Sequence, residues 1–215
     1  MRYFSVQKRV VIDSVQRTGG VYQPDFAKSD YLRSIPDLAP LYRLFLESFN
    51  RLNGTDLPGL VFGFHSAMDN DGSIRPFAGY DEFKRDVRRA RAAVGSLWRH
   101  FSEQDVVVAE LDYEQPFNPL YIDINDFQFL MPPIMCMPPY EEADIDRLVW
   151  AVERGIAMAS PLPSGLVQAC MPCIAPENIV GVYPMFSLEA ERPRGSSSNP
   201  GGEGSFDGEF ARLFS

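Results

Sequence analysis

Short runs of apolar residues, bounded by turn residues, divide the chain into candidate strands. Their valine, isoleucine and aromatic side chains are typical of strands buried in a sheet. The runs lie at Tyr3–Gln7, Leu60–His65, Val106–Asp112, Leu120–Ile122, Leu166–Cys170 and Ile179–Tyr183. Because they are spread over most of the chain, they predict a central sheet built from distant segments.

Apolar residues at helical spacing predict helices between these runs. The stripes lie at 11–15, ended by Gly19-Gly20, at 41–52, at 81–101 and at 141–156. The second stripe follows Asp37, a capping residue, and Pro40, which suits a first turn. Residues 21–36 have no clear period, so a loop is predicted there.

Together these elements predict an α+β fold. Residues 1–190 are expected to form a single globular domain with a mixed or antiparallel central sheet flanked by three or four helices. Residues 191–204 read as a flexible Gly/Ser linker, and 205–215 as a short amphipathic tail. Exposed phenylalanines in that tail favour docking, either on the domain itself or on a partner.

Composition agrees with one soluble domain. The chain has 215 residues, of which 45% are hydrophobic, enough for one packed core. We expect a cytoplasmic protein that does not enter the membrane, since no run approaches the roughly 18 apolar residues of a spanning helix and the first residues lack a signal peptide's apolar stretch. Three cysteines, Cys136, Cys170 and Cys173, are too few for a disulfide framework.

A net charge of -9 argues against a protein that coats nucleic acid non-specifically. The predicted helix 81–101 is the exception, because it carries a basic face. Its cations are Lys84, Arg85, Arg88, Arg89 and Arg99. They are interpreted first as a solvated face paired with nearby acids; the alternative is a docking surface for phosphate or an acidic partner.

Few residues are suited to catalysis, and no catalytic role is predicted. The only histidines are His65 and His100, and no P-loop, nucleophile elbow or G-x-G-x-x-G occurs. Cys170 and Cys173 have the spacing of a redox pair or half a zinc site. Without a second such pair, they are weak metal candidates and are expected to be small buried hydrophobes, so no metal is predicted.

The acidic segment Asp69–Gly72 does not fit a calcium-binding loop. With Gly72 at the sixth position of an EF-hand, the first and twelfth positions hold Ala67 and Ala78 instead of carboxylates. A plain turn is predicted instead.

Three segments resemble the uncharacterised bacterial family called domain of unknown function 3841. They are Phe4–Gln7 followed by a helix and Gly19-Gly20, Pro58–Phe64 before Arg75-Pro76, and Val107–Asp112 leading to Leu120–Phe127. The family's usual tryptophans are replaced by Phe4, Phe62 and Phe64. The family has no established activity that could be transferred to this chain.

The first and last strands are also similar to those of ADP-ribosyltransferase-like domains. The similarity lies in the strand, helix and glycine at the start and in Val167–Cys170 with Pro176–Val182 near the end. It implies an ADP-ribosyltransferase-like fold and NAD as a cofactor. A late-strand glutamate orients the nicotinamide ribose in those enzymes, but the matching residue here is Gln168, which cannot carry the negative charge.

Two functions follow as expectations. The first is a domain that binds NAD or another nucleotide, with or without residual ADP-ribosyltransferase-like activity, in a cleft between the first and late strands. Its ligand-binding candidates are Ser5, Gln7, His65 and Gln168, polar residues near strand ends. The alternative is an acidic regulatory protein of bacterial or phage origin that binds a protein partner through its acidic surface, the proline-rich loop 131–139 or the tail.

Overall fold

The computed structural model describes residues 1–34, 36, 39–68, 73–114, 116–124 and 164–189. The predicted helix 141–156, the proline-rich loop, the acidic turn at 69–72, Cys136, the linker and the tail lie outside these ranges.

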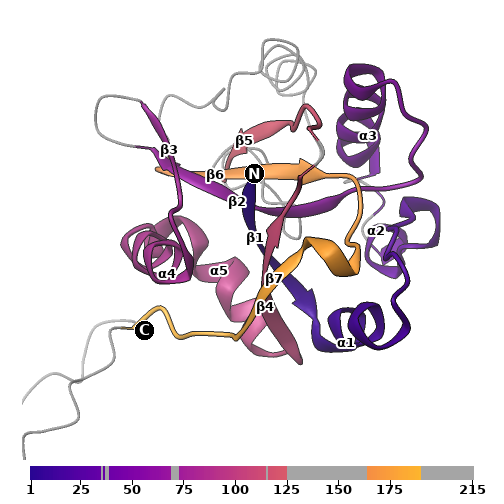
Figure 1. Cartoon of the computed structure of the whole chain (residues 1–215). Coiled ribbons are helices and arrows are strands. Elements are labelled where there is room, and N and C mark those ends of the chain that lie inside the picture. The colour runs from indigo at the N-terminus through magenta and orange to yellow at the C-terminus, as the bar shows by residue number, and fades with distance from the viewer. Residues whose placement is uncertain (35, 37–38, 69–72, 115, 125–163, 190–215) are drawn as a thin grey trace, which may run out of the picture.

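The described strands form one antiparallel sheet (Figure 1). The strands are β1 (Arg2–Lys8), β2 (Val61–Met68), β3 (Ile74–Pro76), β4 (Val106–Asp112), β5 (Tyr121–Asp123), β6 (Leu166–Met171) and β7 (Ile179–Pro184). Their order is β5-β6-β2-β1-β4-β7, with β3 paired to β2. Every strand pair is antiparallel, which confirms the predicted α+β domain and selects the antiparallel sheet of the two forms expected.

The helices lie between these strands in the chain. They are α1 (Arg9–Thr18), α2 (Asp30–Ser34), α3 (Ala39–Asn53), α4 (Tyr80–Arg89) and α5 (Arg91–Ser102), with short 3-10 helices at Phe26–Lys28 and Pro176–Asn178. Figure 1 shows the sheet at the centre, with α3 on one side of the view and α4 and α5 on the other. None of the described helices has the length and hydropathy required to cross a membrane.

The two faces of the sheet carry different sets of side chains. Residues paired across antiparallel strands point to the same face, and successive residues of a strand alternate between faces. Phe4 pairs with Phe64, and Phe64 pairs with Gln168, so these three share one face. That face packs against α3, α4 and α5, whereas α1 covers the other face with Ile12 and Val15.

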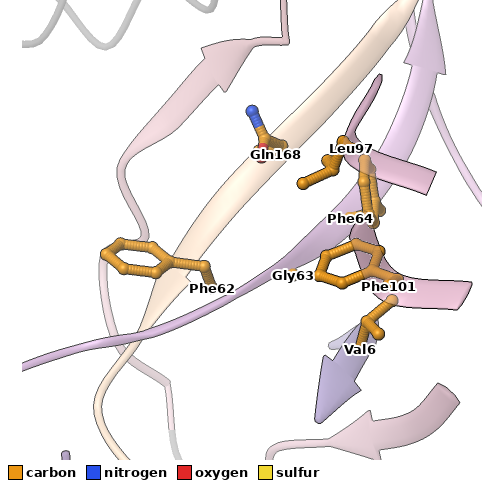
Figure 2. A pocket seen from close by; sticks show the side chains of 7 residues that line it. All are labelled: Val6, Phe62, Gly63, Phe64, Leu97, Phe101 and Gln168. Carbon is orange, nitrogen blue, oxygen red and sulfur yellow. The ribbon is translucent and has the colours of Figure 1, made fainter. Parts of the chain in front are cut away.

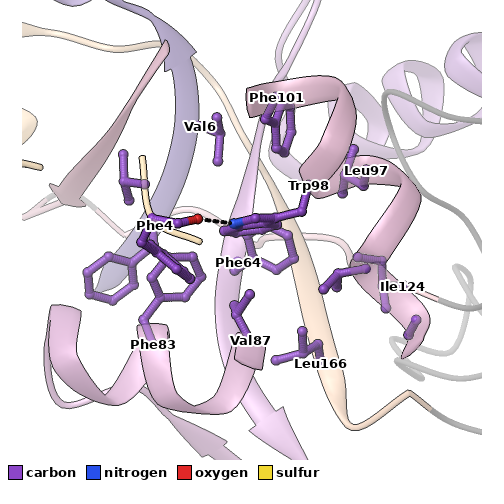
Figure 3. Close-up of a cluster of buried hydrophobic side chains, with 14 of the residues drawn as sticks. Phe4, Val6, Phe64, Phe83, Val87, Leu97, Trp98, Phe101, Ile124 and Leu166 are labelled. Carbon is purple, nitrogen blue, oxygen red and sulfur yellow. Dashed lines mark hydrogen bonds between the residues drawn. The ribbon is translucent and has the colours of Figure 1, made fainter. Parts of the chain in front are cut away.

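Aromatic rings fill the core beneath α4 and α5 (Figure 3). The rings of Phe4 and Phe83 are parallel, with centroids 4.7 Å apart. The indole nitrogen of Trp98 donates a buried hydrogen bond of 2.8 Å to the carbonyl oxygen of Phe186. This bond fixes the segment after β7 against α5.

The predicted helix 81–101 is two helices, which corrects the expectation of one. The chain leaves the helical path at Ala90 (φ -82°, ψ 19°) and begins α5 at Arg91. Apolar spacing could not show this break, because buried positions continue in phase from Phe83 and Val87 to Val94. The break lets two short helices lie against the same aromatic core.

The segment 21–36 is more ordered than the predicted loop. It contains a 3-10 turn at Phe26–Lys28 and α2, and Tyr22 forms an antiparallel bridge with Ile174. Gln23 donates from its amide to the carbonyl oxygens of Gly59 and Pro172, both at 3.1 Å. These bonds join distant loops, so no local periodicity could have shown them. The short β3 was likewise not predicted.

Candidate functional site

The four predicted ligand-binding residues do not form one site. Gln168 shares its face with Phe4 and Phe64 through the strand register, whereas Ser5 and Gln7 alternate with Phe4 along β1 and point to the opposite face. The sheet therefore separates Gln7 from Gln168. The prediction of a cleft between the first and late strands that contains both glutamines is therefore wrong.

Gln168 lies in a small hollow between α5 and the sheet (Figure 2). In this view Phe62 lies on one side of Gln168, and Leu97, Phe64 and Phe101 lie on the other. The cavity volume is about 20 Å³. A volume of that order holds about one water molecule, whereas pockets for drug-sized ligands start at roughly 300 Å³. The hollow is too small for a nucleotide.

Ser5 and Gln7 bond to each other and to the neighbouring strand. The Gln7 amide nitrogen donates to the Ser5 hydroxyl oxygen at 2.8 Å, and that hydroxyl donates to the carbonyl oxygen of Phe62. Ser5 is fully buried. Both side chains thus support the β1–β2 pair.

His65 is buried in an aromatic stack. Its ring lies 5.0 Å from the ring of Tyr3 and 5.2 Å from that of Tyr121, measured between centroids. Burial lowers the His65 pKa, although a hydrogen bond to the Arg2 carbonyl opposes this shift. The ring is therefore neutral near pH 7, and Nδ1, which lies 3.1 Å from that carbonyl oxygen, must carry the proton because a carbonyl only accepts. Because Phe4 pairs with Phe64, the next position along β2, His65, lies opposite Tyr3 on the other face of the sheet.

In the described part of the chain, Cys170 and Cys173 have no neighbouring side chains that could complete a metal site with them. Cys170 is fully buried in the apolar cluster under α3, and burial raises its thiol pKa well above the usual value. Cys173 is half-buried, and its pKa is also raised, first by burial and then by Glu177. Among the described residues, no three His, Cys, Asp or Glu side chains lie close enough together to hold a metal ion.

The basic residues of the predicted helix do converge. They line an open hollow of about 430 Å³ along α4 and the start of α5, which we call the basic hollow. Its lining is Lys84, Arg85, Arg88, Arg89, Arg91, Asp81 and Leu188. Arg99, singled out with the others from the sequence, is not part of it, whereas Arg91, which was not, takes its place.

A buried carboxylate lies beneath the hollow. The Asp86 side chain is 4% exposed, and it accepts from Arg75 and Arg89 at 3.0 Å and from Arg85 at 3.3 Å. Burial raises the Asp86 pKa, but the hydrogen bonds from Arg75 and Arg85 outweigh it, so the net pKa is lowered. Glu82 also bonds Arg75 and Arg85. The predicted pairing with nearby acids is thus confirmed for Arg85 and Arg89, and it fixes these two guanidinium groups at the hollow.

Leu188, the lining residue that lies outside α4 and α5, comes from the segment after β7. Tyr80 donates its hydroxyl to the Pro184 carbonyl oxygen at 3.1 Å, and Arg88 donates from Nε to the Ser187 carbonyl oxygen at 3.0 Å. The Arg88 guanidinium also lies 5.8 Å from the Phe186 ring centroid. These contacts bring the 184–188 segment alongside α4. The four cations on α4 could be found from helical spacing, but the place of Arg91 and of this segment could not.

No family model matches this chain, and neither curated proteins nor solved structures give a match. The resemblances drawn from the sequence therefore stay predictions.

Proposed function

We propose that this domain is a binding module that takes a phosphate-bearing ligand in the basic hollow. The observation that carries the proposal is the convergence of five cations on one hollow of about 430 Å³ in a chain of net charge -9. That volume lies within the range of small-molecule sites, roughly 300–1,000 Å³.

Several arginines in one hollow favour phosphate over other anions. A guanidinium presents a planar fork of donors that matches two phosphate oxygens, whereas an ammonium acts as a point charge. Asp86 and Glu82 form ion pairs with Arg85, and Asp86 also pairs with Arg89. Side chains already held in place lose less conformational entropy when a ligand binds.

The functions predicted from the sequence agree with this proposal to different extents. A nucleotide ligand, NAD included, remains a prediction, but the cleft expected to contain Gln7 and Gln168 no longer supports it. The alternative of a protein partner bound through the proline-rich loop or the tail concerns residues outside the described ranges. An acidic segment of a partner would meet the same cations as phosphate.

The test is a thermal melt of the full chain with increasing inorganic pyrophosphate. A ligand that binds the folded state raises the melting temperature by mass action. We expect this rise for the wild type and an affinity about tenfold or more weaker for the Arg89→Gln/Arg91→Gln variant, since each lost contact of about 1.4 kcal/mol is worth tenfold.

The matched control is Arg51→Gln/Arg99→Gln, which removes the same charge from exposed positions away from the hollow. It should bind pyrophosphate like the wild type. An equal loss in both variants would show that only net charge matters, and an unresponsive wild type would refute the proposed function.

A further inference from the structure

The basic hollow is confined to a short stretch of the surface. Four of its cations, from Lys84 to Arg89, lie on α4 and span about 8 Å along its axis at 1.5 Å per residue, and the fifth, Arg91, begins α5. Asp81 lines the same hollow, and with Glu82 it makes the first turn of α4 acidic. The positive charge is therefore concentrated, with a carboxylate at its edge.

The chain outside the hollow opposes an extended polyanion. The whole sequence has 20 Lys and Arg against 29 Asp and Glu. The hollow takes five of those cations and one acid, which leaves 15 cations against 28 acids elsewhere. A long phosphate backbone that extends beyond the hollow would gain no further excess of cations and would be repelled by this net negative charge.

Donors remain for several phosphate oxygens within this small space. Arg89 gives one nitrogen, Nη1, to Asp86, and Arg85 gives Nε to Asp86 and Nη2 to Glu82. Arg91 makes no hydrogen bond to any side chain in the described ranges and is exposed at the start of α5. Neighbouring guanidinium forks suit phosphate groups that follow one another closely.

We infer that the ligand of the basic hollow is a compact oligophosphate, with two or more phosphate groups in succession, and not an extended nucleic acid strand. This inference rests on the proposed function and specifies its ligand. The shared chemistry is the oligophosphate chain, whether free or attached to a nucleoside.

The test is isothermal titration of the full chain with orthophosphate, tripolyphosphate, ATP and a single-stranded oligonucleotide of about 12 nucleotides, each at low and at physiological salt. We expect tripolyphosphate to bind at least tenfold more tightly than orthophosphate. ATP should match or exceed tripolyphosphate if the oligophosphate comes from a nucleotide, and bind more weakly if the free chain is preferred; both results support the inference. The oligonucleotide should bind more weakly than tripolyphosphate at both salt concentrations.

The inference and the proposed function fail in different ways. Tighter binding of the oligonucleotide, or equal binding of orthophosphate and tripolyphosphate, would overturn the inference. If that oligonucleotide binding is lost in Arg89→Gln/Arg91→Gln but kept in Arg51→Gln/Arg99→Gln, the hollow still binds phosphate and only its ligand class is wrong. If no anion distinguishes these two variants, the proposed function itself fails.

Discussion

Replacing Asp86 by asparagine should destabilise the domain more than any other single loss of negative charge on α4. Its carboxylate is 4% exposed and receives hydrogen bonds from Arg75, Arg85 and Arg89. Asparagine keeps the shape but loses the charge, and its amide nitrogen would face a guanidinium donor. Three charge-assisted hydrogen bonds are thereby weakened or lost.

The expected cost is about 2 kcal/mol. A hydrogen bond to a charged group contributes roughly 1.5–3 kcal/mol, but the arginine partners are 33%, 50% and 69% exposed and regain water when the carboxylate is lost. Most of the gross energy is therefore discounted. For a domain of this size, about 2 kcal/mol lowers the melting temperature by roughly 4–8 °C.

The cost should also depend on pH. Because the Asp86 pKa is lowered in the folded state, its contribution is present above the unfolded carboxyl pKa, near 3.9, and is lost as the pH falls through the lower folded value. Urea denaturation at pH 7 and near pH 3.5 measures the difference between Asp86→Asn and the wild type. That difference should shrink at the lower pH.

The control is Asp81→Asn, which removes the same charge from an exposed position in the first turn of the same helix. It should change the free energy of unfolding by at most about 0.5–1 kcal/mol, the size of a helix-dipole effect. The reasoning is refuted if Asp81→Asn costs as much as Asp86→Asn, or if the Asp86→Asn difference does not change with pH.

Four other substitutions test the fold. Trp98→Phe leaves the buried Phe186 carbonyl without its indole donor and should cost about 1–3 kcal/mol in a urea titration; no loss would mean that water replaces the donor. Gly63→Ala would place a methyl group 2.8 Å from a methionine carbon and 3.1 Å from a backbone oxygen, so the melting temperature should fall, whereas Gly95→Ala, with nothing within 4 Å in α5, should raise it. For His65→Gln, stability should fall less below pH 6.5 than for the wild type, because the lowered pKa keeps the folded histidine neutral while the unfolded one gains a proton; parallel curves would contradict this.

The sequence was sufficient to locate the strands, but not to show which strands lie next to each other in the sheet. Apolar runs located β1, β2, β4, β5, β6 and β7 to within a few residues, because a buried strand needs continuous apolar side chains. Only the three-residue β3, Ile74–Pro76, was missed, since it is too short to show a period. The order of the strands depends on contacts between distant segments, which no local pattern contains.

The candidate site shows the same division between local and distant information. Which face a strand residue occupies depends on register, and a shift of one residue reverses every side chain. Placing Gln7 and Gln168 together required the registers of both β1–β2 and β2–β6, and the second of these also contains a bulge. Their separation could not be foreseen from the chain alone.

The basic hollow was easier to foresee because one helix, α4, supplies four of its five cations. Helical spacing places Lys84 and Arg88 on one stripe, with Arg85 and Arg89 beside them, whereas Arg91 follows the break at Ala90 and was not foreseen. Helical spacing could not show that Arg75 on β3 pairs with the Asp86 carboxylate, or that Arg88 donates a hydrogen bond to the Ser187 carbonyl oxygen. Arg75 holds Asp86, which in turn pairs with Arg85 and Arg89, and the Ser187 carbonyl oxygen holds Arg88. The proposed phosphate binding therefore depends on Asp86 and the 184–188 segment as well as on the cations.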